Sequence, residues 1–216
     1  MKQTFAMNPP KTSLPRIAAL CLMGVLAACN VVPPAQEDAT RYFVLSEPPA
    51  PAPSGGPEHG ALRIGLKSVV LEGYLKRREM VVRTGENEVA FKDYRRWAEP
   101  LDTAVSRIVR STLVASPAVA EVYLEPFPFG PKRDFDVSIE IRRCEGAVVS
   151  GKYVARLSAM IQVSTTGDDA HVVSRRLFLA PPESWDGDDY GQLANLLSID
   201  AAALGRDVLA DVPGSN

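Results

Sequence analysis

The side chains in this 216-residue sequence that could act as nucleophiles, bases or metal ligands are few and far apart. Of the three cysteines, Cys144 directly follows a segment in which apolar and polar residues alternate. A catalytic thiol needs an imidazole beside it, and a zinc site needs closely spaced Cys and His residues. The only histidines are His59, in a Pro- and Gly-rich segment, and His171, at a predicted turn, and we expect both to be solvated. Cys144 is therefore predicted to be a small buried hydrophobe rather than a nucleophile.

Other spacings associated with catalysis do not occur in the chain. The sequence contains no phosphate-binding G-x-x-x-x-G-K-[S/T] segment, no G-x-S-x-G turn and no H-E-x-x-H pair. The run Asp186-Gly187-Asp188-Asp189 resembles the start of a calcium-binding loop, but an EF-hand needs a Glu where Leu197 stands. Capping of a helix by Asp188 or Asp189 explains these carboxylates instead. We predict no enzymatic activity, no cofactor and no metal site.

Cys29 is the residue whose surroundings indicate chemistry. It follows Leu26-Ala27-Ala28 at the end of an apolar run over 17–28, and Lys2, Lys11 and Arg16 precede that run. The run is shorter than the roughly 20 apolar residues that span a bilayer, but it suits the apolar part of a signal peptide. The whole arrangement resembles the bacterial lipoprotein signal, in which the cysteine sulfur is acylated and the cysteine becomes the first mature residue. The alternative is an ordinary secretory signal followed by a chance cysteine.

Acylation at Cys29 divides the chain into four predicted parts. Residues 1–28 are a signal peptide, 29–40 a lipidated Pro-rich tether, 41–212 one domain and 213–216 a tail. Two or more acyl chains anchor a protein stably, whereas one holds only marginally. An extended tether of about 11 residues would reach roughly 35 Å. Asn30 stands where an Asp favours inner-membrane retention, so we expect the outer membrane, with the domain on its periplasmic face.

Composition excludes one class of partner. Three of the 24 Lys and Arg residues precede Cys29, whereas all 26 Asp and Glu residues follow it, so the mature chain is more acidic than the net charge of −2 of the whole sequence. A mildly acidic domain lacks the basic footprint of a nucleic-acid binder, and it gives no reason to expect binding to anionic headgroups. The length suffices for a real core without disulfides.

Apolar periodicity predicts the regular elements. The clearest strand, over 135–143, alternates Phe135, Val137, Ile139 and Ile141 with polar residues. The clearest helix starts at Trp97, carries Pro100 in its first turn and ends before Ser116-Pro117. The other predicted strands cover 41–45, 62–66, 80–82, 89–91, 119–124, 153–165 and 172–180, and a last helix covers 189–209. Residues 48–60, rich in Pro and Gly, are predicted to form a loop.

The predicted order is four strands, a helix, four strands and a helix. Short turns between most strands, together with only two helices, predict an α+β fold. We expect a mixed, mostly antiparallel sheet with both helices packed on one face.

Several landmarks resemble those of the ABC-type transport auxiliary lipoproteins, of the PqiC/YmbA type. They include Gly73-Tyr74-Leu75, the block 96–101 (Arg-Trp-Ala-Glu-Pro-Leu) and Asp134-Phe135-Asp136-Val137. Further landmarks are the Val81-Val82-Arg83 strand, Gly151 before a long strand and Asp189-Tyr190 before the last helix. The resemblance runs in order from Tyr42 to Val212. Glu72 and Lys76 depart from it, because many members carry a Pro and an Asp there.

The resemblance implies a fold like the TolB amino-terminal domain and a non-enzymatic periplasmic role in the outer membrane. It implies partners as well, namely an MCE-domain protein and the membrane components of an ABC transporter that move lipid between the envelope membranes. It also implies a homo-oligomer, with a ring as one form. The alternative function is a lipoprotein regulator of a cell-wall synthase with a TolB-like domain.

Four residues are candidate partner contacts: Tyr74, Arg77, Arg78 and Trp97. Exposed aromatic residues and arginines often anchor protein interfaces. For Trp97 the alternative is packing onto the sheet from the first turn of its helix. For the Lys76-Arg77-Arg78 cluster the alternative is a solvated loop, although the cluster stands out in an acidic domain.

Overall fold

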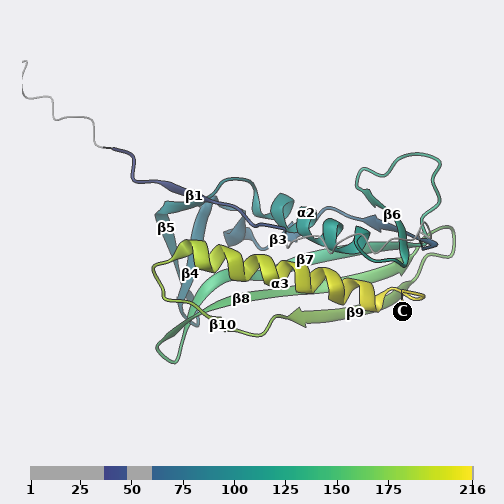
Figure 1. Ribbon diagram of the computed structural model, residues 1–216. Coiled ribbons are helices and arrows are strands. Elements are labelled where there is room, and N and C mark those ends of the chain that lie inside the picture. The colour runs from purple at the N-terminus through teal and green to yellow at the C-terminus, as the bar shows by residue number, and fades with distance from the viewer. Residues whose placement is uncertain (1–36, 48–59, 216) are drawn as a thin grey trace, which may run out of the picture. The chain divides into compact units, whose positions relative to one another are not determined.

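A computed structural model describes residues 37–47 and 60–215 (Figure 1). The predicted signal peptide, Cys29, most of the tether, the 48–59 segment and His59 lie outside these residues. The chain divides into two compact units, 1–39 and 40–216, and the fold below is that of the second. Its elements are β1 (Arg41–Phe43), β2 (Leu62–Leu66), β3 (Val70–Leu71), the 3-10 helix η2 (Gly73–Lys76), β4 (Glu79–Gly85), β5 (Glu88–Trp97), α2 (Leu101–Val114), β6 (Val119–Leu124), β7 (Phe135–Val149), β8 (Lys152–Thr165), β9 (Val172–Leu179), β10 (Glu183–Ser184) and α3 (Tyr190–Asp211).

The β7–β8 hairpin is the spine of the sheet (Figure 1). Its antiparallel ladder runs from Phe135 opposite Thr165 to Val149 opposite Lys152. The other edge of β7 is shared by three strands in succession: β2 pairs with its start, β3 with its middle and β4 with its last third. From Leu71, opposite Ile141, to Val82, opposite Gly146, the chain advances 11 residues while β7 advances 5, so the segment between β3 and β4 must leave the sheet and return to it.

The remaining strands extend the sheet on both sides of the spine. Beyond β4 lie β5 and then β1, and β6 lies beyond β2, while β9 and β10 pair with the free edge of β8. The long ladders, β7–β8, β8–β9 and β4–β5, are antiparallel, and the pairings of β1, β2 and β3 are parallel. The predicted α+β class with a mixed sheet is therefore confirmed.

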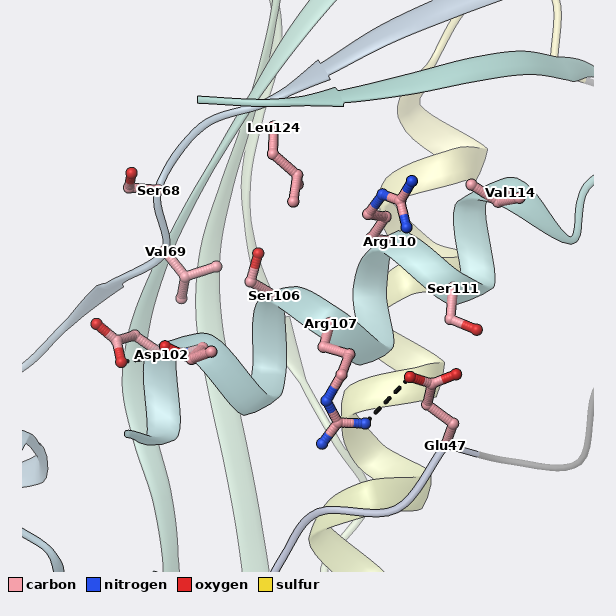
Figure 2. A pocket seen from close by; sticks show the side chains of 11 residues that line it. Glu47, Ser68, Val69, Asp102, Ser106, Arg107, Arg110, Ser111, Val114 and Leu124 are labelled. Carbon is pink, nitrogen blue, oxygen red and sulfur yellow. Dashed lines mark hydrogen bonds and ion pairs between the residues drawn. The ribbon is translucent and has the colours of Figure 1, made fainter. Parts of the chain in front are cut away.

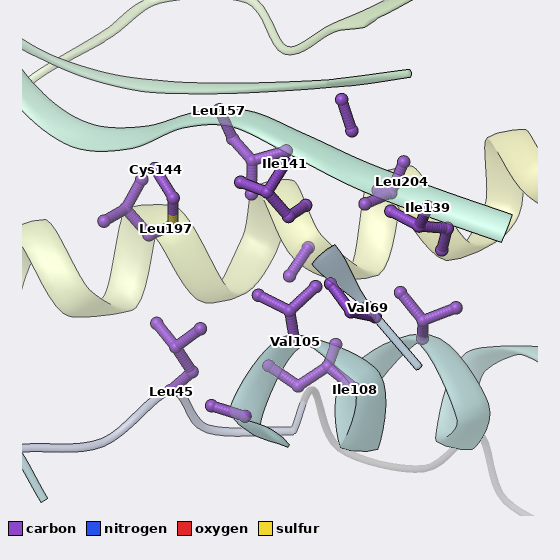
Figure 3. Close-up of a cluster of buried hydrophobic side chains, with 14 of the residues drawn as sticks. Leu45, Val69, Val105, Ile108, Ile139, Ile141, Cys144, Leu157, Leu197 and Leu204 are labelled. Carbon is purple, nitrogen blue, oxygen red and sulfur yellow. The ribbon is translucent and has the colours of Figure 1, made fainter. Parts of the chain in front are cut away.

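Both helices cover the same face of the sheet, and the core lies between this face and the helices (Figures 1 and 3). Val105 and Ile108 of α2 and Leu197 of α3 point into one cluster with Ile141 and Leu157 of the spine. In β8 the alternating residues Ala155, Leu157, Ala159, Ile161 and Val163 are all buried, as their spacing predicts. Burial of one apolar face on each helix stabilises it, because most helical stability in proteins comes from packing of such a face rather than from intrinsic propensity.

The helix start predicted at Trp97 is wrong. Trp97 is the last residue of β5, Pro100 occupies the N-cap of α2, and the first helical residue is Leu101. The three- and four-residue spacing of apolar residues extends by chance into the preceding strand. The backbone instead follows the register of β5, where Trp97 lies opposite Phe43 of β1.

The predicted end of the central strand at residue 143 is also wrong, because β7 continues to Val149. A register shift between Ile141 and Arg143 reverses the alternation, so that Cys144, rather than an odd-numbered residue, enters the core. A β-bulge of this kind inserts one residue into a strand and exchanges its two faces. β3, η2 and β10 have too few residues to show any period, and they were not predicted.

Candidate binding surface around the 3-10 helix

The 3-10 helix η2 forms where the chain crosses from β3 to β4 beside β7. The Glu72 N–H donates to the Ile141 carbonyl at 3.1 Å, which holds the start of this crossing against the spine. The Leu75 N–H donates to the Glu72 carbonyl at 2.9 Å, and the Leu75 side chain is buried in the core. The buried Leu75 side chain thus anchors the turn to the core, and the neighbouring Tyr74 and Lys76 lie at the surface.

Tyr74 lies half-buried over the bulged part of β7. Its hydroxyl donates to the Arg142 carbonyl at 3.2 Å, and the Arg83 guanidinium lies 5.6 Å from its ring centroid. Burial raises the pKa of Tyr74 to about 12, and the neighbouring charge of Glu145 acts in the same direction. Tyr74 therefore remains neutral and serves as a hydrogen-bond donor and an aromatic surface.

The buried carboxylate of Glu145 holds the guanidinium of Arg83 in place. The Nε of Arg83 donates to Glu145 Oε1 at 2.7 Å, and the Glu145 side chain is 0% exposed. This hydrogen bond is the main cause that raises the pKa of Arg83. The second carboxylate oxygen of Glu145 is buried without a partner among the described residues. A buried charge needs a paired counter-charge, so Glu145 orients Arg83 towards Tyr74.

Arg77 and Arg78 follow η2 and are both exposed. The Arg77 guanidinium lies 4.5 Å from the ring centroid of Phe91 and pairs with Glu79 at 3.2 Å. The pKa of Glu79 is lowered first by a backbone hydrogen bond and then by Arg77. Arg78 accepts a hydrogen bond at its carbonyl from the Trp97 N–H at 2.8 Å, while its side chain extends into solvent.

Three of the four candidate contact residues therefore come together, and the fourth does not. Trp97 is only 4% exposed and packs in the core, as the alternative for this residue states. The exposed Arg77 and Arg78, together with the partly buried Tyr74 and Arg83, are called the η2 surface below. Arg83 was missed by sequence reasoning, because only the parallel pairing of β4 with β7 brings it to Glu145. Guanidinium groups beside an aromatic ring are suited to carboxylates and polar protein segments.

A groove along α2 is a further feature that the sequence did not reveal (Figure 2). Arg107 closes one side of it, donating to Glu99 at 2.6 Å, to the Leu45 carbonyl at 2.8 Å and to Glu47 at 3.1 Å. The volume of the groove is about 570 Å³. It is lined by Glu47, Ser68, Val69, Asp102, Thr103, Ser106, Arg107, Arg110, Ser111, Val114 and Leu124. These residues come from four separate segments, so no local pattern connects them.

The other chemistry-bearing residues have structural contacts. Cys144 is buried, as predicted, and burial together with the charge of Asp200 raises its pKa. Asp189 caps α3, its carboxylate accepting from the Gly191 and Gln192 N–H groups, which confirms one of the two predicted caps. His171 contacts the Thr165 hydroxyl. Within residues 37–47 and 60–215 no cluster of metal-binding side chains occurs. No helix within those ranges has the length and apolar character needed to cross a membrane.

These features define an α+β domain whose candidate site is a cationic and aromatic surface. A model of the ABC-type transport auxiliary lipoprotein component family matches residues 43–208, and the chain belongs to that family. Membership makes it a membrane-associated envelope component with an auxiliary role in an ABC-type transport system.

Two solved structures share the fold. A Xanthomonas campestris protein assigned to the DUF330 family model has a TM-score of 0.64 and 15% identity, covering 78% of this chain and 92% of its own. An uncharacterized protein has a TM-score of 0.60 and 15% identity, covering 78% and 95% of the two chains. At this identity the likeness concerns the fold alone. None of the curated proteins compared with the chain matches it.

Proposed function

We propose that this protein is the outer-membrane-anchored, periplasmic docking component of a Pqi-like lipid transport system. In this system it would join an MCE-domain protein and the membrane components of an ABC transporter. The family match over residues 43–208 carries the proposal. The Leu26-Ala27-Ala28-Cys29 signal supports it, because acylation would hold the domain at the envelope.

The η2 surface is the proposed docking contact within this role. Arg77 and Arg78 extend from a turn that the buried Leu75 holds in place. The backbone of this turn therefore loses little conformational freedom when a partner binds. Arg83 is already oriented by Glu145 at 2.7 Å and lies beside Tyr74. Assembly into a homo-oligomer, with a ring as one form, belongs to the same proposal.

Capture of the transporter tests the proposal. The acylated full-length chain, purified from detergent-solubilised envelopes, is expected to bring with it the MCE-domain protein and the transporter subunits. The double variant Arg77→Glu and Arg78→Glu is expected to lower that capture about tenfold, because like charges then face the partner's acidic groups. The measurement is the quantity of each subunit recovered per captured chain.

Arg206→Glu is the matched control, since Arg206 is also an exposed arginine but lies on α3. It is expected to leave capture unchanged. If the wild-type chain captures no transporter subunit in repeated trials, the proposed function is wrong. If the double variant captures as much as the wild type, the function stands and the η2 surface is not the contact.

A further inference from the structure

The strand β9 lies at an open edge of the sheet (Figure 1). It has eight residues, and within residues 37–47 and 60–215 its only pairing is with β8. A register shift beside Ser164 leaves Val173 without an opposite residue on β8. At the other end Pro181 and Pro182 follow the strand, and neither has an N–H to donate. The regular part of the open edge therefore covers residues 174–179.

The main-chain groups of β9 alternate between β8 and the open edge. The Ala180 N–H donates to the Leu157 carbonyl at 3.0 Å, so Ala180 points towards β8. Successive residues of an antiparallel strand point to opposite sides, so the even-numbered residues of this stretch bond to β8. The N–H and C=O groups of Arg175, Leu177 and Leu179 point outwards, and the described part of the chain holds no partner for them. Such a row of unpaired groups is a template for a further strand.

The side chains of the same three residues lie on the face of the sheet that the helices leave uncovered. Arg176 points to the helix face, because its Nε donates to Asp211 of α3 at 2.8 Å. Side chains alternate along a strand, so Arg175, Leu177 and Leu179 point the other way. Leu177 is 49% exposed and Leu179 is 66% exposed. The open edge is thus apolar at two positions and cationic at the third.

Arg175 carries an uncompensated charge. Its neighbour Arg176 is paired with both Asp207 and Asp211. Arg175 is exposed, lies opposite the neutral Gln162 of β8, and has no ion pair among residues 37–47 and 60–215. Opposite charges on facing residues of two strands stabilise their pairing. An Asp or a Glu opposite Arg175 would therefore suit this edge.

A second copy of the chain does not supply that carboxylate. β9 contains two arginines and neither Asp nor Glu. When two β9 strands pair with each other, Arg175 of each copy faces only neutral or cationic side chains, and like charges across a ladder are destabilising. The charge of this edge therefore favours a segment of a different protein.

We propose that β9 binds an extended segment of a partner protein, which joins the sheet as an additional strand. The segment places apolar side chains opposite Leu177 and Leu179 and a carboxylate opposite Arg175. Main-chain hydrogen bonds give such a contact its affinity, and the alternate side chains give it specificity. The inference rests on the proposed function, because the segment belongs to a subunit of the transport assembly. β7 and β8 separate this edge from the η2 surface, so the contact is an additional one.

Photocrosslinking with a mapped product tests the contact. The photoreactive residue p-benzoylphenylalanine replaces Leu177 in the full-length chain in cells, and in a second strain it replaces Ile199 on α3, which is similarly exposed at 51%. Position 177, and not position 199, is expected to form an adduct with a transporter or MCE-domain subunit. Mass spectrometry should place the link in a segment of alternating apolar residues with an Asp or a Glu. Adducts only with lipid, with a second copy or within the same chain overturn the inference, as does the absence of an adduct.

Charge variants test the role of Arg175. Arg175→Glu is expected to lower subunit capture about tenfold, because like charges then face each other, whereas Arg175→Lys retains capture. Arg206→Glu on α3 again serves as the control and should leave capture unchanged. None of these changes should alter the melting temperature, since both arginines are exposed. Capture by Arg175→Glu equal to that of the wild type would overturn the assigned carboxylate contact.

A proline variant tests the main-chain pairing. Leu177→Pro removes an N–H that β8 does not use, and proline is tolerated at such edge positions. It is expected to lower capture about tenfold, whereas Leu177→Val retains both the N–H and the capture. Melting curves of both variants establish that they fold. If the wild type captures transporter subunits and Leu177→Pro captures them equally, β9 is not the contact and the proposed function stands. If the wild type captures none, the proposed function fails, and the β9 contact within that assembly fails with it.

Discussion

Asp200 shows, at the scale of a single residue, how burial changes chemistry. This acid on α3 is only 4% exposed, and its Oδ2 has no hydrogen-bond partner among the described residues. Burial raises its pKa to about 6, and the charge of Glu183 on β10 adds to the effect. In the unfolded chain an aspartate has a pKa of about 3.9. Between these two values the folded state binds the proton and the unfolded state does not.

Stability is therefore expected to fall as the pH rises from about 4 through the folded pKa of about 6. Asp200→Asn removes the ionisation, so the variant should exceed the wild type at pH 8 by about 3 °C in melting temperature, or about 1 kcal/mol. The difference should disappear towards pH 4. Thermal melts of both proteins across this range provide the measurement. A variant less stable than the wild type at every pH would mean that the carboxylate has a partner.

At the scale of an element, α3 depends on a cap that the sequence already suggests. The Asp189 carboxylate accepts from the Gly191 N–H at 2.9 Å and from the Gln192 N–H at 3.1 Å. It thus satisfies two of the donors that the start of a helix leaves free. The neighbouring Asp186 carboxylate accepts from the Asp188 and Asp189 N–H groups, which lowers its pKa and shapes the approach to the helix.

Asp189→Ala is expected to cost about 1 kcal/mol of folding free energy, because both N–H groups lose their acceptor. Chemical denaturation of purified protein measures this loss. Asp188→Ala is the matched control, since the Gly191 and Gln192 N–H groups donate to Asp189 and not to Asp188, and it should change stability little. Equal losses in the two variants would show that charge near the helix end matters and that the cap geometry does not.

At the scale of the whole molecule, we propose that the sulfur of Cys29, which lies outside the described residues, decides where the domain works. Cys29→Ser should move the chain from the membrane fraction to the soluble periplasmic fraction, because a protein without its acyl chains has no stable anchor. Cell fractionation followed by immunodetection measures this. Cys144→Ala is the control, since Cys144 is buried in the core and should not affect fractionation. Retention of the Cys29→Ser chain in outer membranes would contradict lipid anchoring.

The sequence by itself determined the elements whose side chains repeat with a regular period. From Ala155 to Val163 in β8 and from Val137 to Ile141 in β7 every second residue is apolar, and these residues are buried. The last helix, a cap at Asp188 or Asp189 and the buried state of Cys144 were likewise predictable, and the structure shows that Asp189 is the cap. Periodicity reports which side of an element faces the core, because apolar side chains must leave water.

Only the tertiary structure decided which elements meet. The pairing of β4 with β7 brings Arg83 to Glu145, 62 residues away, and the crossing at η2 brings Tyr74 to Arg142, 68 residues away. A single register shift after Ile141 exchanges the faces of β7, and the pairing of β5 with β1 draws Trp97 out of its expected helix. Pairing partners and register are non-local, since they depend on how the complete core packs. The local order of residues therefore carries no signal for them.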